Sequence, residues 1–174
     1  LLSQLTVMSL AGYVYPNVYG SAAAQSTASL LGTVVMLIVC APFASKLAAK
    51  FGKKELAVAS SICSALVWLV CLIWRPASVW GFVACYILAN VGMGFFNTII
   101  WAMITDVIDD AEVRSGIRED GTIYSVYSFA RKLGQAFSSG LVGALLGIIG
   151  YTEATAFDPA VTRGIFNMAC IAPI

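Results

Sequence analysis

Two basic residues, Arg131 and Lys132, lie in the middle of a run, residues 122–149, that otherwise has the length and character of a membrane-spanning helix. A Lys or Arg near the centre of a bilayer costs about 2.5 to 3.5 kcal/mol even on insertion scales, so such residues usually face a bundle interior or an aqueous cavity. The run therefore predicts a helix inside a polytopic bundle, with a polar pathway beside it.

Composition places the whole chain in a bilayer, because 60% of its 174 residues are hydrophobic and only 11% are charged. A span needs about 20 apolar residues. The sequence predicts one all-α domain, residues 1–174, with helices over residues 1–14, 27–47, 56–74, 79–105, 122–149 and 164–174. Both ends lie in apolar sequence, so we expect truncated first and last helices and a fragment of a longer membrane protein.

The basic residues between the apolar segments are unevenly distributed. One side of the membrane has Lys46, Lys50, Lys53, Lys54, Arg114 and Arg118, and the other has Arg75 and Arg163. Since Lys and Arg are retained in the cytoplasm, the richer side is predicted to be cytoplasmic in a multi-pass protein of the cell membrane. The expected surroundings are the lipid bilayer, with no nucleic-acid partner. Without histidine, and with all cysteines in apolar runs, no metal site is expected in this chain.

Two polar stripes are predicted at helical spacing. The stripe on residues 122–149 contains Tyr124, Ser128, Arg131, Gln135, Ser138 and Ser139, with Tyr127 and Lys132 on its flanks, and the stripe on residues 79–105 contains Asn90, Gly94, Asn97, Trp101 and Thr105. Hydroxyls, amides, a charge and an indole together suit a sugar. The alternative is hydrogen bonding between helices. Gly143 and Gly147 predict close approach of a neighbouring backbone.

An acidic link follows the fourth segment and contains Asp106 and Asp109 with Arg114 and Arg118. It is either a solvated loop or a cytoplasmic gate in which Asp106 pairs with Arg114 or Arg118. Several such pairs are needed to bias a conformational equilibrium, because exposed pairs contribute only about 0 to 1 kcal/mol each. A membrane enzyme using Asp106 and Asp109 as acid and base is disfavoured, because no nucleophile with a partner and no metal-ligand set accompany them.

Three motifs point to a family: residues 101–106 (WAMITD), 116–121 (GIREDG) and 124–136 (YSVYSFARKLGQA). They resemble the glycoside-pentoside-hexuronide:cation symporters, the melibiose permease relatives of the major facilitator superfamily. The resemblance implies that the chain is the C-terminal six-helix half of a twelve-helix transporter. It implies that Lys132 lies near the sugar and the coupled cation, with Tyr127 and Ser128 in contact with the sugar. The aspartates that coordinate the cation belong to the N-terminal half.

A weaker resemblance covers residues 46–54 (KLAAKFGKK), which are similar to the basic loop motif of that superfamily. Ala49 stands where the motif usually has Asp, so that charge contact is missing. Gly52 among the lysines predicts a tight cytoplasmic turn.

The predicted function is cation-coupled sugar symport by alternating access, with Na⁺ or H⁺ as coupling ion, Li⁺ as a further candidate, and no other cofactor. The expected partners are a sugar or glycoside and the N-terminal half. The alternatives are a carrier of an amphipathic lipid or drug, and a non-transporting membrane scaffold. The predicted substrate and coupling residues are Lys132, Tyr127, Ser128, Arg131, Tyr124, Gln135, Asn97 and Trp101, and the predicted gate residues are Asp106, Arg114, Arg118, Lys50, Gly52 and Lys53.

Overall fold

The computed structural model describes residues 2–174, which form seven helices. They are α1 (Leu2–Tyr13), the π-helix η1 (Val14–Val18), α2 (Ala22–Phe51), α3 (Lys53–Trp74), α4 (Val79–Ser115), α5 (Asp120–Ile148) and α6 (Pro159–Ile171). The described part of the chain contains no strand, which confirms the all-α prediction.

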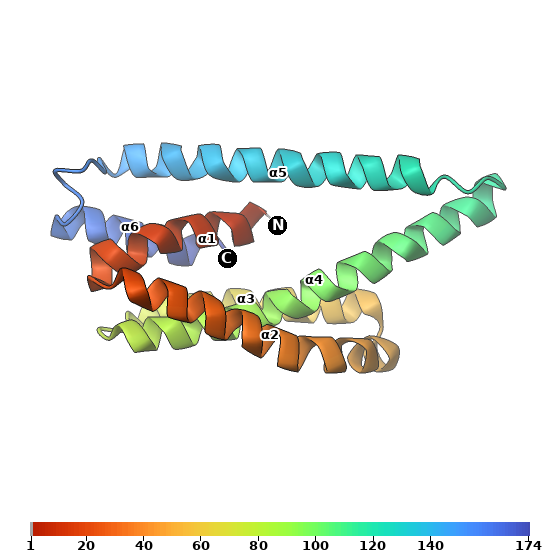
Figure 1. Ribbon diagram of the computed structural model, residues 1–174, viewed down its shortest axis with the longest axis horizontal. Coiled ribbons are helices and arrows are strands. Elements are labelled where there is room, and N and C mark those ends of the chain that lie inside the picture. Colours follow the sequence, from red (N-terminus) through yellow and green to blue (C-terminus); the bar gives the residue numbers. More distant parts are fainter. Residues whose placement is uncertain (1) are drawn as a thin grey trace.

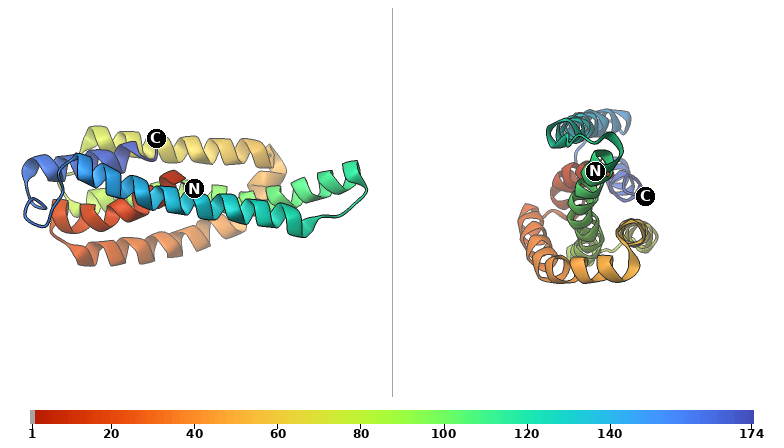
Figure 2. Two further views of the ribbon diagram at one scale, coloured as in Figure 1. Left: turned by 90° about the horizontal axis from the view of Figure 1, so that it is seen from above. Right: turned by 90° about the vertical axis from the view of Figure 1, so that its right-hand side faces the viewer.

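Helix α4 lies at the centre of the bundle and packs against both α2 and α3 (Figures 1 and 2). Helices α1 and α6 pack on each other, and α6 also contacts α3. Helix α5 runs along the outside and packs mainly on α1, with few contacts to α4. Helix α1 therefore provides most of the packing that holds α5 on the bundle, and α4 adds a smaller contact.

Two glycines let α4 approach its neighbours closely. A methyl group at Gly92 would lie 2.9 Å from the carbonyl oxygen of Ser60 in α3, and one at Gly94 would lie 2.7 Å from Cγ of Met36 in α2. The Ser64 hydroxyl donates to the Ala89 carbonyl at 3.1 Å, so α3 and α4 are also hydrogen-bonded. These contacts determine how far α4 stands from α2 and α3.

Helix α2 is longer than the predicted residues 27–47. It begins after Ser21, whose hydroxyl accepts from the Ala24 N–H at 3.4 Å as a helix N-cap. It ends at Gly52, where φ is +97° and α3 begins at the next residue. The predicted basic link is therefore two helix ends joined by a one-residue turn, which needs glycine because φ is positive.

Helix α4 continues to Ser115, beyond the predicted end at residue 105. Asp106 and Asp109 are thus helical, and the interpretation of residues 106–115 as a loop is wrong. Arg114 pairs with Asp110 one turn earlier at 3.0 Å. The helix stops at Gly116, whose φ is +72° and whose N–H donates to the Glu112 carbonyl at 2.8 Å. The charged residues end the apolar segment but not the helix, because a helix can continue in solvent, where pairs four residues apart such as Asp110 with Arg114 stabilise it.

Three helices of the described residues are long and apolar enough to cross a membrane: α3, α4 and residues Ala22–Cys40 of α2. Helix α5 is long enough, but Arg131 and Lys132 lower its hydropathy. Helices α1 and α6, of 12 and 13 residues, are about 18 to 20 Å long at 1.5 Å per residue. This is shorter than the roughly 30 Å of hydrocarbon that a full span crosses.

The glycines of α5 do not carry the predicted helix contact. A methyl group at Gly140, Gly143 or Gly147 would meet no other described residue within 4 Å. Instead, α5 is joined to α1 by a buried hydrogen bond between the hydroxyls of Thr6 and Ser138 at 3.0 Å. Ser138, which was predicted as part of the polar stripe on residues 122–149, is therefore a helix-packing residue.

Candidate functional site

The two predicted polar stripes meet at a cavity of about 330 Å³ bounded by α1, α2, α4 and α5. Five predicted site residues line it, together with five residues that the sequence did not single out. The predicted ones are Asn97, Trp101, Tyr127, Arg131 and Gln135, and the others are Gln4, Leu5, Met8, Met36 and Ile100.

The indole of Trp101 forms the centre of an aromatic group beside this cavity. The guanidinium carbon of Arg131 lies 5.8 Å from the centroid of the Trp101 ring. Tyr127 meets the same ring edge-on at 5.5 Å, and Tyr124 stacks on it at 6.2 Å with an interplanar angle of 27°. A cation over an indole is attracted to the negative ring face. This contact orients Arg131 toward α4 and keeps its donors at the cavity.

Amide groups supply the neutral polar part of the cavity wall. The side-chain N–H of Asn97 donates to the Gln4 carbonyl oxygen at 3.1 Å, linking α4 to α1. Each amide keeps further hydrogen-bonding capacity, since an amide has two donors and two acceptor lone pairs. Gln4 was missed in the sequence, although it is a polar residue in the first apolar segment.

Several predicted site residues do not line this cavity. Lys132 and Ser128 have exposed side chains on α5 and are absent from the cavity wall. Arg131 and Lys132 point about 100° apart, as neighbours on a helix do. On α4, Asn90 lies at a different cavity, and the Thr105 hydroxyl bonds to the Trp101 carbonyl of its own helix at 3.2 Å. The structure therefore places Arg131, but not Lys132, at this cavity.

Asp106, a predicted gate residue, pairs with Lys53 and not with the predicted Arg114 or Arg118. Lys53 Nζ lies 2.6 Å from Asp106 Oδ1 and 2.7 Å from Oδ2, so the lysine contacts both carboxylate oxygens. The pair joins the first residue of α3 to α4, and both side chains are partly exposed. The predicted partners were wrong because helical α4 carries Asp106 beside the start of α3.

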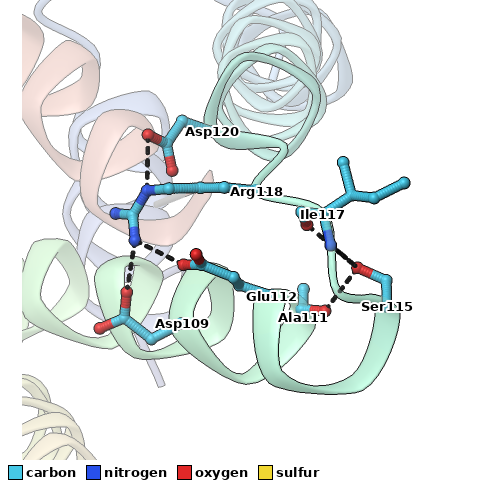
Figure 3. Close-up of polar contacts among 7 residues, drawn as sticks. All are labelled: Asp109, Ala111, Glu112, Ser115, Ile117, Arg118 and Asp120. Carbon is cyan, nitrogen blue, oxygen red and sulfur yellow. Dashed lines mark hydrogen bonds and ion pairs between the residues drawn. The ribbon is translucent and has the colours of Figure 1, made fainter.

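Arg118 is the centre of a separate ion-pair cluster between α4 and α5 (Figure 3). Its Nη1 lies 2.7 Å from Glu112 Oε2 and 3.3 Å from Asp109 Oδ1, and its Nε donates to Asp120 Oδ2 at 3.1 Å. Hydrogen bonds to Asp120 and Glu112 raise the pKa of the Arg118 guanidinium. One arginine thus holds three carboxylates at the point where the chain passes from α4 to α5.

The remaining basic residue of the predicted gate, Lys50, lies over the ring of Phe51 with its Nζ 5.3 Å from the ring centroid. Among the described residues, no group of three or more His, Cys, Asp or Glu could hold a metal ion.

This arrangement defines a membrane helix bundle with a polar, aromatic cavity, the class of structure expected of solute carriers. A model of the family "MFS/sugar transport protein" matches residues 1–174. The chain belongs to this family and, with its relatives, to the glycoside-pentoside-hexuronide:cation symporters of the major facilitator superfamily. The matched family is one of transporters, which confirms the prediction that the chain is not an enzyme.

Several curated proteins are similar to this chain in sequence. The uncharacterized symporter YjmB of Bacillus subtilis is 39% identical over 109 residues, which cover 63% of this chain and 24% of the relative. The glucuronide carrier protein homolog of Escherichia coli is 29% identical over 147 residues, 83% of this chain and 32% of the relative. A candidate sulfoquinovose importer of Escherichia coli is 30% identical over 143 residues, 82% of this chain and 30% of the relative.

The chain thus spans about a quarter to a third of the length of these relatives. No solved structure gives a significant match to the chain.

Proposed function

We propose that the full-length protein containing this chain is a cation-coupled sugar symporter of the cell membrane, and that the cavity beside Arg131 is this chain's share of the sugar site. Transport proceeds by alternating access, in which two six-helix bundles move about a site near the bilayer midplane. The N-terminal half supplies the other wall of the site.

The observation that carries this proposal is the placement of the Arg131 guanidinium over the Trp101 indole at a cavity that also presents amides. The apolar face of a sugar ring packs on an indole, while its hydroxyls bond to amides such as those of Asn97 and Gln135. A volume of about 330 Å³ lies at the lower end of the range for small-ligand sites. The site therefore suits a ligand of monosaccharide size.

The charge of Arg131 favours a sugar that carries a negative group. Among the described residues, no carboxylate lies within 4 Å of its guanidinium. A guanidinium binds a carboxylate or sulfonate through two parallel hydrogen bonds, which adds geometric selectivity to charge. Two relatives have names that refer to glucuronide and sulfoquinovose, which are both acidic sugars. We therefore assign to the cavity a sugar acid as preferred substrate.

Lys132 has a different role in this proposal, because it faces away from the cavity. When the cation site of the N-terminal half is empty, the ammonium of Lys132 pairs with a carboxylate there. When Na⁺, H⁺ or Li⁺ occupies that carboxylate, the lysine is released. Coupling then arises from competition between two cations for one anion.

The test is uptake by full-length protein in proteoliposomes, using a radiolabelled glucuronide and the matching neutral glucoside. Arg131→Gln raises the KM for the glucuronide by roughly tenfold or more, because a charge-assisted pair is lost. The same variant changes the KM for the glucoside less. Lys132→Gln keeps glucuronide binding but abolishes stimulation of uptake by a cation gradient. Lys54→Gln, which removes an equal charge far from the cavity, is the matched control.

Unchanged discrimination between the two sugars in Arg131→Gln refutes the sugar-acid assignment, and unchanged cation stimulation in Lys132→Gln refutes the coupling role.

The cavity also has an apolar wall of Leu5, Met8, Met36 and Ile100, which is the feature an amphipathic cargo requires. Competition of uptake by an alkyl glycoside but not by the free sugar acid would favour that alternative.

A further inference from the structure

A second cavity, of about 390 Å³, lies at the opposite end of α3 from Lys53, where two connecting segments of the bundle meet the start of α6. It is bounded by the η1–α2 link, the α3–α4 link and the first turns of α6. Its wall consists of Val18, Tyr19, Arg75, Pro76, Ala77, Thr162, Arg163, Phe166 and Asn167. None of these residues lines the cavity beside Arg131.

Arg75 has an unusual backbone that is held in place from two sides. It ends α3 with φ +45° and ψ +67°, and it is the one non-glycine residue of the described chain with positive φ. Its Nη2 donates to the Asn167 carbonyl oxygen at 3.1 Å. The Tyr19 hydroxyl donates to the Pro76 carbonyl at 2.9 Å. The left-handed conformation ends the helix, with the Arg75 N–H donating to the Cys71 carbonyl at 3.0 Å, and the two tertiary contacts fix this link at the cavity wall.

The cavity has positive charge that the described residues do not neutralise. Neither Arg75 nor Arg163 has a carboxylate within 4 Å among residues 2–174. The acidic residues of this end, Glu153 and Asp158, form no ion pair with them there. Arg163 lies early in α6, which begins at Pro159, and it lines the cavity together with Arg75. The cavity is therefore suited to an anion.

The position of the cavity indicates a lipid as the source of the anion. Trp74, which ends the apolar helix α3, is 63% exposed, and Trp80 at the start of α4 is 60% exposed. Exposed indoles at the ends of apolar helices are typical of the membrane interface. Arg75 directly follows Trp74, so the two guanidiniums lie at headgroup depth. Phe166 and Val18 supply an apolar part of the wall, which suits the first methylene groups of an acyl chain.

We propose that this cavity binds the phosphate group of an anionic phospholipid headgroup, held between Arg75 and Arg163. Asn167 positions the Arg75 guanidinium for this contact. The site is independent of the transport proposal, since it lies at the other end of the bundle from the gate and shares no residue with the sugar cavity.

Native mass spectrometry of the full-length protein tests this site, with dioleoylphosphatidylglycerol and dioleoylphosphatidylcholine supplied at equal concentration. The wild type retains phosphatidylglycerol in preference to phosphatidylcholine. The double variant Arg75→Asn with Arg163→Gln loses that preference by roughly tenfold, because two charge-assisted contacts are removed. Asn is chosen at position 75 because it tolerates positive φ. Arg75→Lys keeps the charge but loses the planar fork, and retains an intermediate preference.

Lys54→Gln is the charge-matched control, and it keeps the full preference because it lies at the other end of α3. Equal retention of the two lipids by the wild type overturns the proposal, as does an equal loss of preference in Lys54→Gln. A separate thermal-stability titration with inorganic phosphate distinguishes the source of the anion. Stabilisation by phosphate that depends on Arg75 and Arg163, without retention of phosphatidylglycerol, also overturns it, because the ligand is then a free anion.

Discussion

Replacement of Gly92 by alanine tests the packing that positions the site. The added methyl group would lie 2.9 Å from the Ser60 carbonyl oxygen and 3.2 Å from Cβ of Ser64. The oxygen belongs to the backbone of α3 and cannot rotate away, so α3 and α4 must move apart. Overpacking of this kind costs about 1 to 3 kcal/mol. The same substitution also stabilises the helix itself by about 0.5 to 1 kcal/mol, because alanine loses less conformational entropy than glycine on folding.

Gly32→Ala is the matched control, because Gly32 lies within α2 and a methyl group there meets nothing within 4 Å of the described residues. Both variants gain the same helix propensity, so the difference in their free energies of unfolding isolates the packing cost. We expect Gly92→Ala to be less stable than Gly32→Ala by about 1 to 3 kcal/mol.

The assay is equilibrium unfolding of the full-length protein in mixed micelles with increasing dodecyl sulfate, followed by circular dichroism. Sugar binding is measured on the same samples, and we expect it to weaken in Gly92→Ala because α4 carries Asn97 and Trp101. Equal stability of the two variants would refute the close approach of α3 and α4, and unchanged sugar affinity would refute its role in positioning the site.

Three further predictions concern contacts between helices. In a double-mutant cycle of Lys53→Gln and Asp106→Asn, we expect a coupling free energy of about 0.2 to 1 kcal/mol, as for an exposed ion pair. This coupling falls as salt is added, because salt screens exposed charges. A coupling free energy that does not respond to salt contradicts the prediction. Thr6→Val leaves the buried Ser138 hydroxyl without its partner and destabilises the protein by about 1 to 3 kcal/mol, measured by the same unfolding assay; a neutral result contradicts the contact. Arg118→Gln releases three carboxylates and increases hydrogen exchange of residues 116–120, whereas unchanged exchange shows that the cluster does not hold the α4–α5 connection.

The sequence predicted the class of the protein and five residues of the candidate cavity, for a physical reason. Charges are costly inside an apolar span, so Arg131 and Lys132 had to adjoin a polar region. Helical periodicity then placed Arg131 on the same face as Gln135, and Asn97 on the same face as Trp101. Both faces line one cavity in the structure.

The sequence did not predict which residue on another helix each side chain contacts. Periodicity defines a face of one helix but not the helix that covers it, so Asp106 was assigned to arginines near in sequence and not to Lys53. The helical state of residues 106–115 was missed because their charges end the membrane segment without ending the helix.

The sequence by itself determined that this chain is a membrane bundle of a sugar-transporter family with a polar face on α5, because burying charge in lipid is costly and the motif residues are local in sequence. Only the tertiary structure decided that Arg131 lines the cavity while Lys132 does not, that Gln4 completes the amide wall, and that Ser138 belongs to helix packing. These outcomes depend on which helices are neighbours and on their rotation about their axes, and close packing settles both only when the whole bundle has assembled.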